Sequence, residues 1–214
     1  MRIASAHRAV VGLALVGQML AGCGDDDVLG VDAAPGFDAA PGFDAEPGFD
    51  AEPCTVPSAG YGAVGTIQMD SAMRLFEMGD ERVFWIGNLE LVEATRDDLE
   101  VRLFAGFGAF ETAPIAPGTY EIAGPELDYA TCGVCILLRG DSVSPGAQQL
   151  LAQSGSLRID ALGPSGAGNF QATFTNATFT HVSIDPMTAE STIIDDGCVT
   201  SLESADWDTP IQGE

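Results

Sequence analysis

The chain has 214 residues, which is room for one substantial domain with attachments or for two small domains. Its 32 acidic residues outnumber eight basic ones and give a formal charge of -24, which excludes a nucleic-acid binder that follows the phosphate backbone. All eight basic residues are arginine, so Schiff-base chemistry on lysine and a phosphate-loop lysine are also excluded.

The first predicted element, residues 1–22, has the parts of a secretory signal peptide. Arg2 and Arg8 supply a positively charged start, and residues 9–20 form an apolar stretch. This stretch is too short to span a bilayer, which needs about 20 apolar residues. We therefore expect the segment to direct export and to be removed.

The signal ends in Leu20-Ala21-Gly22-Cys23, which resembles the lipobox of bacterial lipoproteins. The resemblance implies cleavage between Gly22 and Cys23, a diacylglycerol thioether on the cysteine sulfur and an acyl chain on the new N-terminus. Such a lipid holds a protein on a bilayer without spanning it. Gly24 stands where enteric lipoproteins of the inner membrane carry Asp, so a lipid-anchored place in the cell envelope is expected, with the outer membrane favoured over the inner. No other cofactor is expected.

The next element is a hexapeptide that residues 31–54 repeat four times, as VDAAPG, FDAAPG, FDAEPG and FDAEPC. Proline removes a backbone donor and glycine raises the entropic cost of order, so neither helix nor sheet propagates. Residues 23–53 are therefore predicted to be a disordered acidic tether with a reach between roughly 30 and 90 Å. Phe37, Phe43 and Phe49 leave two interpretations open: duplication of a tolerated unit, or weak anchors for a cell-envelope protein or glycan.

Residues 54–214 form the predicted head, in which short segments of alternating polarity are separated by turn residues. Residues 145–153 fit either a short helix or an edge strand. Many short strands without crossover helices predict an all-β head, an antiparallel β-sandwich or a jelly-roll-like fold. The expected strands are Thr66–Met69, Ala72–Phe76, Arg82–Leu91, Leu99–Phe104, Gly118–Ile122, Cys135–Arg139, Leu157–Asp160, Asn169–Thr175 and Ala177–Ile184.

The head contains four cysteines, an even number that suits disulfides in an oxidising compartment and allows three pairings. Cys54 begins the head and Cys198 lies near its end, so a bridge between them would staple both termini. Cys132 and Cys135 then form the second bridge, which requires a turn at Gly133-Val134. The competing pairings join Cys54 and Cys198 separately to Cys132 and Cys135.

Motifs for catalysis or metal binding are weak. The run Cys132-Gly133-Val134-Cys135 resembles the thioredoxin active-site motif, but its apolar, β-branched flanks favour a strand, and a zinc site lacks a second pair of ligands. His181 is the single histidine after the signal, and a strand at this position places it on a partly exposed face with Phe179. The pairs Asp97-Asp98 and Asp195-Asp196 lack the spacing of a calcium loop. No catalytic residue and no metal ligand are therefore expected.

A wider resemblance involves the segments YATCGVCILL at 129–138, AQSGSLRI at 152–159, NATF at 176–179 and VSID at 182–185. They resemble a group of β-rich lipoproteins from GC-rich Gram-negative bacteria that has no assigned activity. The likeness covers about 65–198 and implies an envelope location and a β-rich head, but no site. The sequence thus favours an anchored binding or structural module of unknown ligand. The alternative is an anchored enzyme, either a thiol-disulfide oxidoreductase or a hydrolase.

Overall fold

The computed structural model describes residues 53–77, 80–92 and 95–213. All of them belong to one unit of the chain, Phe49–Glu214. The expected signal peptide, the expected lipidation site Cys23 and all of the predicted tether except Pro53 lie outside the described residues. Within the described ranges, no helix is long and apolar enough to cross a membrane.

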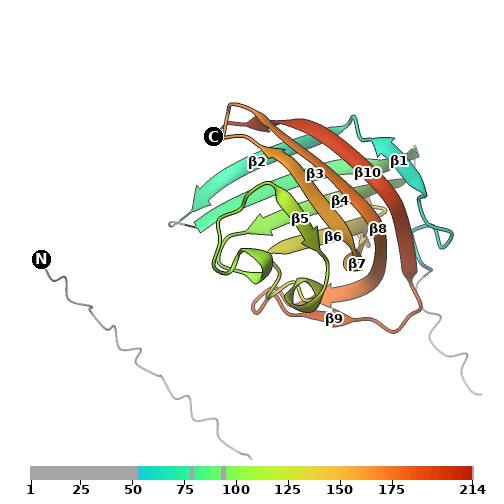
Figure 1. Cartoon of the computed structure of the whole chain (residues 1–214). Helices are drawn as coiled ribbons and strands as arrows, with labels where there is room; N and C mark the ends of the chain where they lie inside the picture. Colours follow the sequence, from blue (N-terminus) through green and yellow to red (C-terminus); the bar gives the residue numbers. More distant parts are fainter. Residues whose placement is uncertain (1–52, 78–79, 93–94, 214) are drawn as a thin grey trace, which may run out of the picture. The chain divides into compact units, whose positions relative to one another are not determined.

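The described residues form ten strands and two short 3-10 turns (Figure 1). In chain order these are β1 (Ala63–Thr66), β2 (Asp70–Glu77), β3 (Asp80–Val92), β4 (Thr95–Phe104), η1 (Gly108–Phe110), β5 (Gly118–Glu121), η2 (Gly124–Leu127), β6 (Val134–Gly140), β7 (Gln148–Leu162), β8 (Asn169–Ile184), β9 (Ser191–Ile193) and β10 (Val199–Gln212).

The strands belong to a single sheet that curls until its two ends meet. Its order runs β1, β10, β2, β3, β4, β6, β7, β8 and β9, with β5 added beside β7. Strand β10 pairs antiparallel with β8 along most of its length and also pairs in parallel with β2 at Ile211 and Gln212. These two pairings close the circuit of long strands, which Figure 1 shows curving round a common interior.

The interior is filled by the apolar residues that alternate along each strand. Leu99, Val101 and Leu103 of β4 are fully buried in the main core. Trp85 of β3 stacks on Trp207 of β10 with ring centroids 4.1 Å apart. Because these aromatic side chains come from strands far apart in the sequence, the core itself helps to hold the sheet closed.

A second, smaller core lies on the outer surface of the sheet. Leu137 of β6, Leu151 of β7 and Val182 of β8 pack together, with Tyr129 and Ile184 beside them. This explains why β6 is apolar on both faces, since its outward residues are covered as well as its inward ones.

The all-β class expected from the sequence is confirmed. The strands form one curled sheet that is mixed rather than purely antiparallel, because β10 pairs in parallel with β1 and with β2. The expected strand Thr66–Met69 is wrong, because β1 ends at Thr66 and β2 begins at Asp70. The helix considered for residues 145–153 is also wrong: Gln148 begins β7, which is a central strand between β6 and β8.

Candidate functional site

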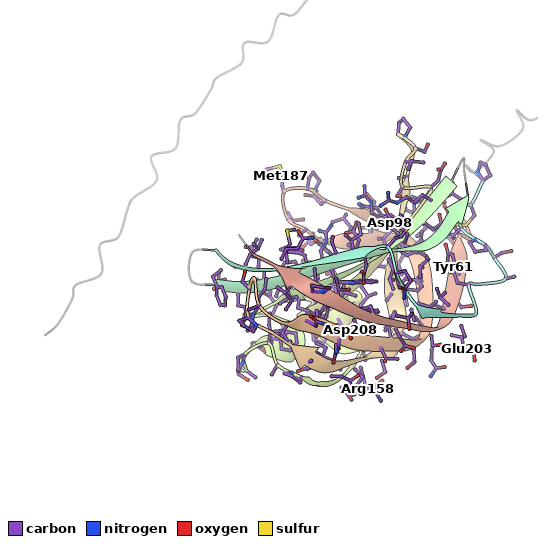
Figure 2. The ribbon with its side chains drawn as sticks, turned by 90° about the horizontal axis from the view of Figure 1, so that it is seen from above. Tyr61, Asp98, Arg158, Met187, Glu203 and Asp208 are labelled. Carbon is purple, nitrogen blue, oxygen red and sulfur yellow. A yellow bond between two sulfur atoms is a disulfide. The ribbon has the colours of Figure 1, made fainter. Side chains whose placement is uncertain are left out.

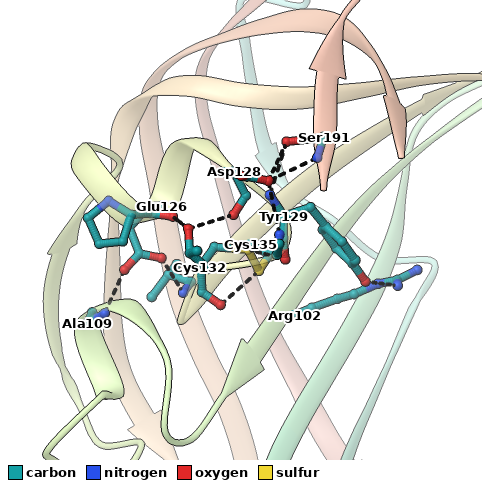
Figure 3. Close-up of a disulfide and its surroundings, with 12 residues drawn as sticks. Arg102, Ala109, Glu126, Asp128, Tyr129, Cys132, Cys135 and Ser191 are labelled. Carbon is teal, nitrogen blue, oxygen red and sulfur yellow. Dashed lines mark hydrogen bonds between the residues drawn. A yellow bond between two sulfur atoms is a disulfide. The ribbon is translucent and has the colours of Figure 1, made fainter. Parts of the chain in front are cut away.

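The Cys132–Cys135 disulfide joins the loop after η2 to the start of β6 (Figure 3). Its Cα atoms are 5.3 Å apart, and both cysteines are buried. Gly133 makes the turn, and Val134 already begins β6. A side chain at Gly133 would collide with the backbone carbonyl of Phe107, so the loop approaches its neighbour too closely for any other residue.

The carboxylate of Glu126 holds this loop in place through hydrogen bonds. Its side chain is 3% exposed, and its two carboxylate oxygens accept hydrogen bonds from different backbone groups. The N–H of Ala109 donates to Oε1 and that of Val134 to Oε2, both at 2.6 Å (Figure 3). Burial raises the pKa of Glu126, against the lowering effect of these bonds. The Glu126 side chain, on η2, therefore connects η2 to both η1 and β6.

The carboxylate of Asp128 ties the same loop to Ser191 of β9. Its Oδ1 atom accepts hydrogen bonds from the backbone N–H and the hydroxyl of Ser191, each at 3.0 Å, and from the N–H of Ala130 at 3.1 Å. These bonds, led by that from the Ser191 backbone, lower the pKa of Asp128. With Glu126 and Asp128 on either side, the loop holds Tyr129 in a fixed place against the sheet.

Tyr129 meets a row of charged side chains on the outward surface of β4 and β6. Arg96 pairs with Asp98 at 2.8 Å, and Glu100 pairs with both Arg102 and Arg139. The two carboxylates are about 5% exposed, whereas the three arginine side chains are 30 to 40% exposed. The carboxylates of Asp98 and Glu100 are therefore buried against the sheet, and the guanidinium groups above them are partly exposed to solvent.

Arg102 keeps its charge and donates three hydrogen bonds within the head, to Glu100 and to Tyr129. Burial alone would lower the pKa of Arg102, but the charge of Glu100 and the hydroxyl of Tyr129 raise it above its ordinary value. A guanidinium has five N–H donors in a planar fork. Nη1 of Arg139 reaches Glu100 at 3.3 Å, while its Nε is buried and has no hydrogen-bond partner among the described residues.

Aromatic rings lie against two arginines of this surface, Arg82 and Arg102. Phe104 makes edge-to-face contacts with Phe84 and with Tyr129, with centroids 6.0 and 6.3 Å apart. The guanidinium carbon of Arg82 lies 5.9 Å from the ring centroid of Phe104, and that of Arg102 lies 5.6 Å from Tyr129, within cation–π range. We define the arginine–aromatic face as Arg82, Phe84, Arg96, Arg102, Phe104, Tyr129 and Arg139.

Two small hollows open on this face. One of about 180 Å³ is lined by Arg82, Phe104, Phe107, Tyr129 and Cys132, among others. Another, of about 170 Å³, lies along β2, β3 and β4. Pockets for drug-sized ligands measure about 300–1,000 Å³, so each hollow suits one ring or side chain of a larger partner rather than a whole cofactor.

The structure contains the two disulfides that the sequence favoured. Cys54 is bonded to Cys198 with Cα atoms 5.3 Å apart, and Cys132 is bonded to Cys135. Neither competing pairing is formed. The first bridge joins the start of the described chain to the residue that precedes β10, while the C-terminal end of the head lies at the other end of that strand. Gly22 and Cys23, the predicted cleavage and lipidation positions, lie outside the described residues.

His181 is less exposed than the sequence suggested, with 15% of its side chain accessible. Its Nδ1 lies 2.6 Å from Oδ2 of Asp196, and Oδ1 of Asp196 accepts the backbone N–H of Cys198 at 2.9 Å. These two bonds lower the pKa of Asp196. The pair therefore secures the chain at the Cys54–Cys198 bridge.

The acidic pairs do not converge on a cation. Asp97 accepts hydrogen bonds from the Tyr61 hydroxyl at 2.6 Å and from the N–H of Asp141 at 2.8 Å, while Asp98 pairs with Arg96. In the part of the chain that the structure describes, no group of three or more His, Cys, Asp or Glu side chains is placed to hold a metal ion.

Sequence reasoning missed the arginine–aromatic face. Alternation along β4 already places Arg102 opposite the core residues, but the neighbours of Arg102 depend on the register with β3 and β6 and on the loop that brings Tyr129. The chain matches no protein-family model, no curated protein and no solved structure.

Proposed function

We propose that this chain is a lipid-anchored cell-envelope protein whose β head is a binding module for anionic partners, with the arginine–aromatic face as its binding surface. The lipobox-like residues Leu20 to Cys23 support the anchor, and the acidic repeats support a spacer that carries the head away from the bilayer. An outer-membrane place remains part of the proposal, because Gly24 follows the cysteine.

The observation that carries the binding role is the distribution of positive charge. Six arginines follow the signal segment in a chain of formal charge -24, and four of them, Arg82, Arg96, Arg102 and Arg139, belong to this face. Arg158 lies on the opposite side of the head from Asp98 (Figure 2). An acidic surface elsewhere repels an anion, so electrostatics favours encounter at this one face.

The runner-up is a thiol-disulfide oxidoreductase at Cys132 and Cys135. One observation favours it: Cys132 borders the 180 Å³ hollow. Against it, both cysteines are buried and bonded to each other, whereas a catalytic pair needs an accessible thiolate. Alkylation of the native protein after mild reduction separates the two proposals, since rapid labelling of Cys132 supports the enzyme. A serine hydrolase would use His181, whose Nδ1 lies beside Asp196 as in a catalytic triad, but among the described residues no serine, threonine or cysteine is hydrogen-bonded to its Nε2.

Binding is tested with a labelled copolymer of glutamate and tyrosine, which combines negative charge with aromatic rings. The full chain in detergent should bind it saturably, and Arg82→Gln should weaken binding about tenfold or more, the effect of losing one charge-assisted contact. Arg158→Gln is the matched control, because it removes the same charge from the opposite side. Equal weakening by both variants, or no binding at all, would contradict the proposal.

A further inference from the structure

The hexapeptide repeats carry the chemistry that the arginine–aromatic face complements. In the last three repeats a phenylalanine is followed directly by an aspartate, and two of them carry a glutamate two residues later. Each unit therefore offers one ring and one or two carboxylates. Each hollow accommodates about one ring, and the guanidinium groups around it are partners for carboxylates.

We propose that the arginine–aromatic face binds the phenylalanine-aspartate repeats of a neighbouring copy of this chain. The inference rests on the proposed function, because it names the partner of the same face. The repeat ring enters the hollow bordered by Phe104, Phe107 and Tyr129, and the carboxylates that follow it pair with Arg82 and Arg102.

The spacing of the repeat agrees with the spacing of the face. In a polyproline-type chain the phenylalanine and the glutamate three residues on share one side and lie about 9 Å apart. Along β4, Phe104 lies two positions after Arg102, or about 7 Å away. Figure 3 shows Tyr129 and Arg102 in direct contact, so a ring beside Tyr129 has a guanidinium within that reach.

The charge of the head and the number of repeats in each chain indicate that the repeats come from a neighbouring chain. The face is the cationic part of a strongly acidic molecule, so two heads repel unless an acidic segment meets this face. Proline limits the freedom that an extended segment loses on binding, which is how proline-rich ligands bind aromatic-lined grooves. Three phenylalanine repeats per copy add avidity when several copies share one surface.

The test uses a labelled synthetic peptide of residues 42–53, GFDAEPGFDAEP, and the full chain in detergent. The chain carries alanine at Phe37, Phe43 and Phe49, so that its own repeats do not compete. We expect saturable binding that falls at least tenfold with Arg82→Gln in the chain and stays unchanged with Arg158→Gln.

Peptide variants provide the decisive comparison. Replacing both phenylalanines by alanine, or both aspartates by asparagine, should weaken binding at least tenfold, and equal binding of either variant overturns the inference. In sedimentation, the chain with its phenylalanines intact should self-associate as concentration rises, and the alanine variant should not.

The outcomes also separate this inference from the proposed function. If the glutamate–tyrosine copolymer binds at the face and the repeat peptide does not, the partner is wrong and the binding role stands. If neither binds, both are wrong. Binding to phosphatidylglycerol vesicles that falls with Arg82→Gln but not with replacement of the repeat phenylalanines would assign the face to lipid and overturn the inference.

Discussion

Glu126 offers a sharp test of how the disulfide loop is held. The substitution Glu126→Gln keeps the size of the side chain but replaces one acceptor oxygen by an amide nitrogen. Ala109 and Val134 donate to different oxygens of Glu126, both at 2.6 Å, so glutamine satisfies only one of them. The other N–H then faces a donor at a position that is 3% exposed.

An unsatisfied buried donor costs about 1–3 kcal/mol of unfolding free energy. For a head of this size, each kcal/mol lowers the melting temperature by about 2–4 °C, so we expect a fall of roughly 4–8 °C for a loss near 2 kcal/mol. Thermal unfolding followed by circular dichroism measures it directly.

The matched control is Asp128→Asn. The three hydrogen bonds to Asp128 go to Oδ1, which asparagine retains, so the melting temperature should fall less than in Glu126→Gln. Equal falls in the two variants, or an unchanged melting temperature in Glu126→Gln, would refute the claim that Glu126 stabilises the head by connecting η1 to β6.

Other predictions concern the anchor, the tether, the long disulfide and pH. Cys23→Ser should abolish partition into detergent, and retention there would disprove the lipid anchor. Deleting residues 31–48 should leave the melting temperature of dilute protein unchanged, since the repeats are expected to bury no core; a shift of several degrees would show otherwise. Replacing Cys54 and Cys198 by alanine should lower the unfolding free energy by roughly 2–5 kcal/mol in denaturant titrations. The lowered pKa of Asp196 contributes stability above the ordinary aspartate pKa that is lost as pH falls through the folded value; Asp196→Asn should flatten this acid limb of the stability profile, and an unaltered limb would contradict it.

The alternation of apolar and polar residues predicted much of the sheet, because the buried residues occupy every second position along several strands. Leu99, Val101 and Leu103 are buried as their spacing indicates. The sequence predicted two strands, divided at Asn176, where the structure has the single strand β8. Asn176 has a φ of 54° and no register partner in β7 or β10, but the pairing continues on both sides of it.

Strand β10, which closes the sheet, is not among the strand ranges expected from the sequence. Its inward residues include Leu202, Ala205 and Trp207, but acidic residues and Pro210 separate them, so the segment lacks the apolar content of a typical strand. The candidate site was beyond sequence reasoning for a related reason. Its contacts, such as Arg82 over Phe104, join different strands and depend on register.

The most direct test of the anionic binding face is a map of where an anionic aromatic probe contacts the head. Nuclear magnetic resonance of the isotope-labelled chain, titrated with the glutamate–tyrosine copolymer, reports each backbone amide separately. The account predicts that the largest shift changes fall at Arg82, Phe104 and Tyr129, with none around Arg158. Changes centred on Arg158, or spread evenly over the head, would contradict it.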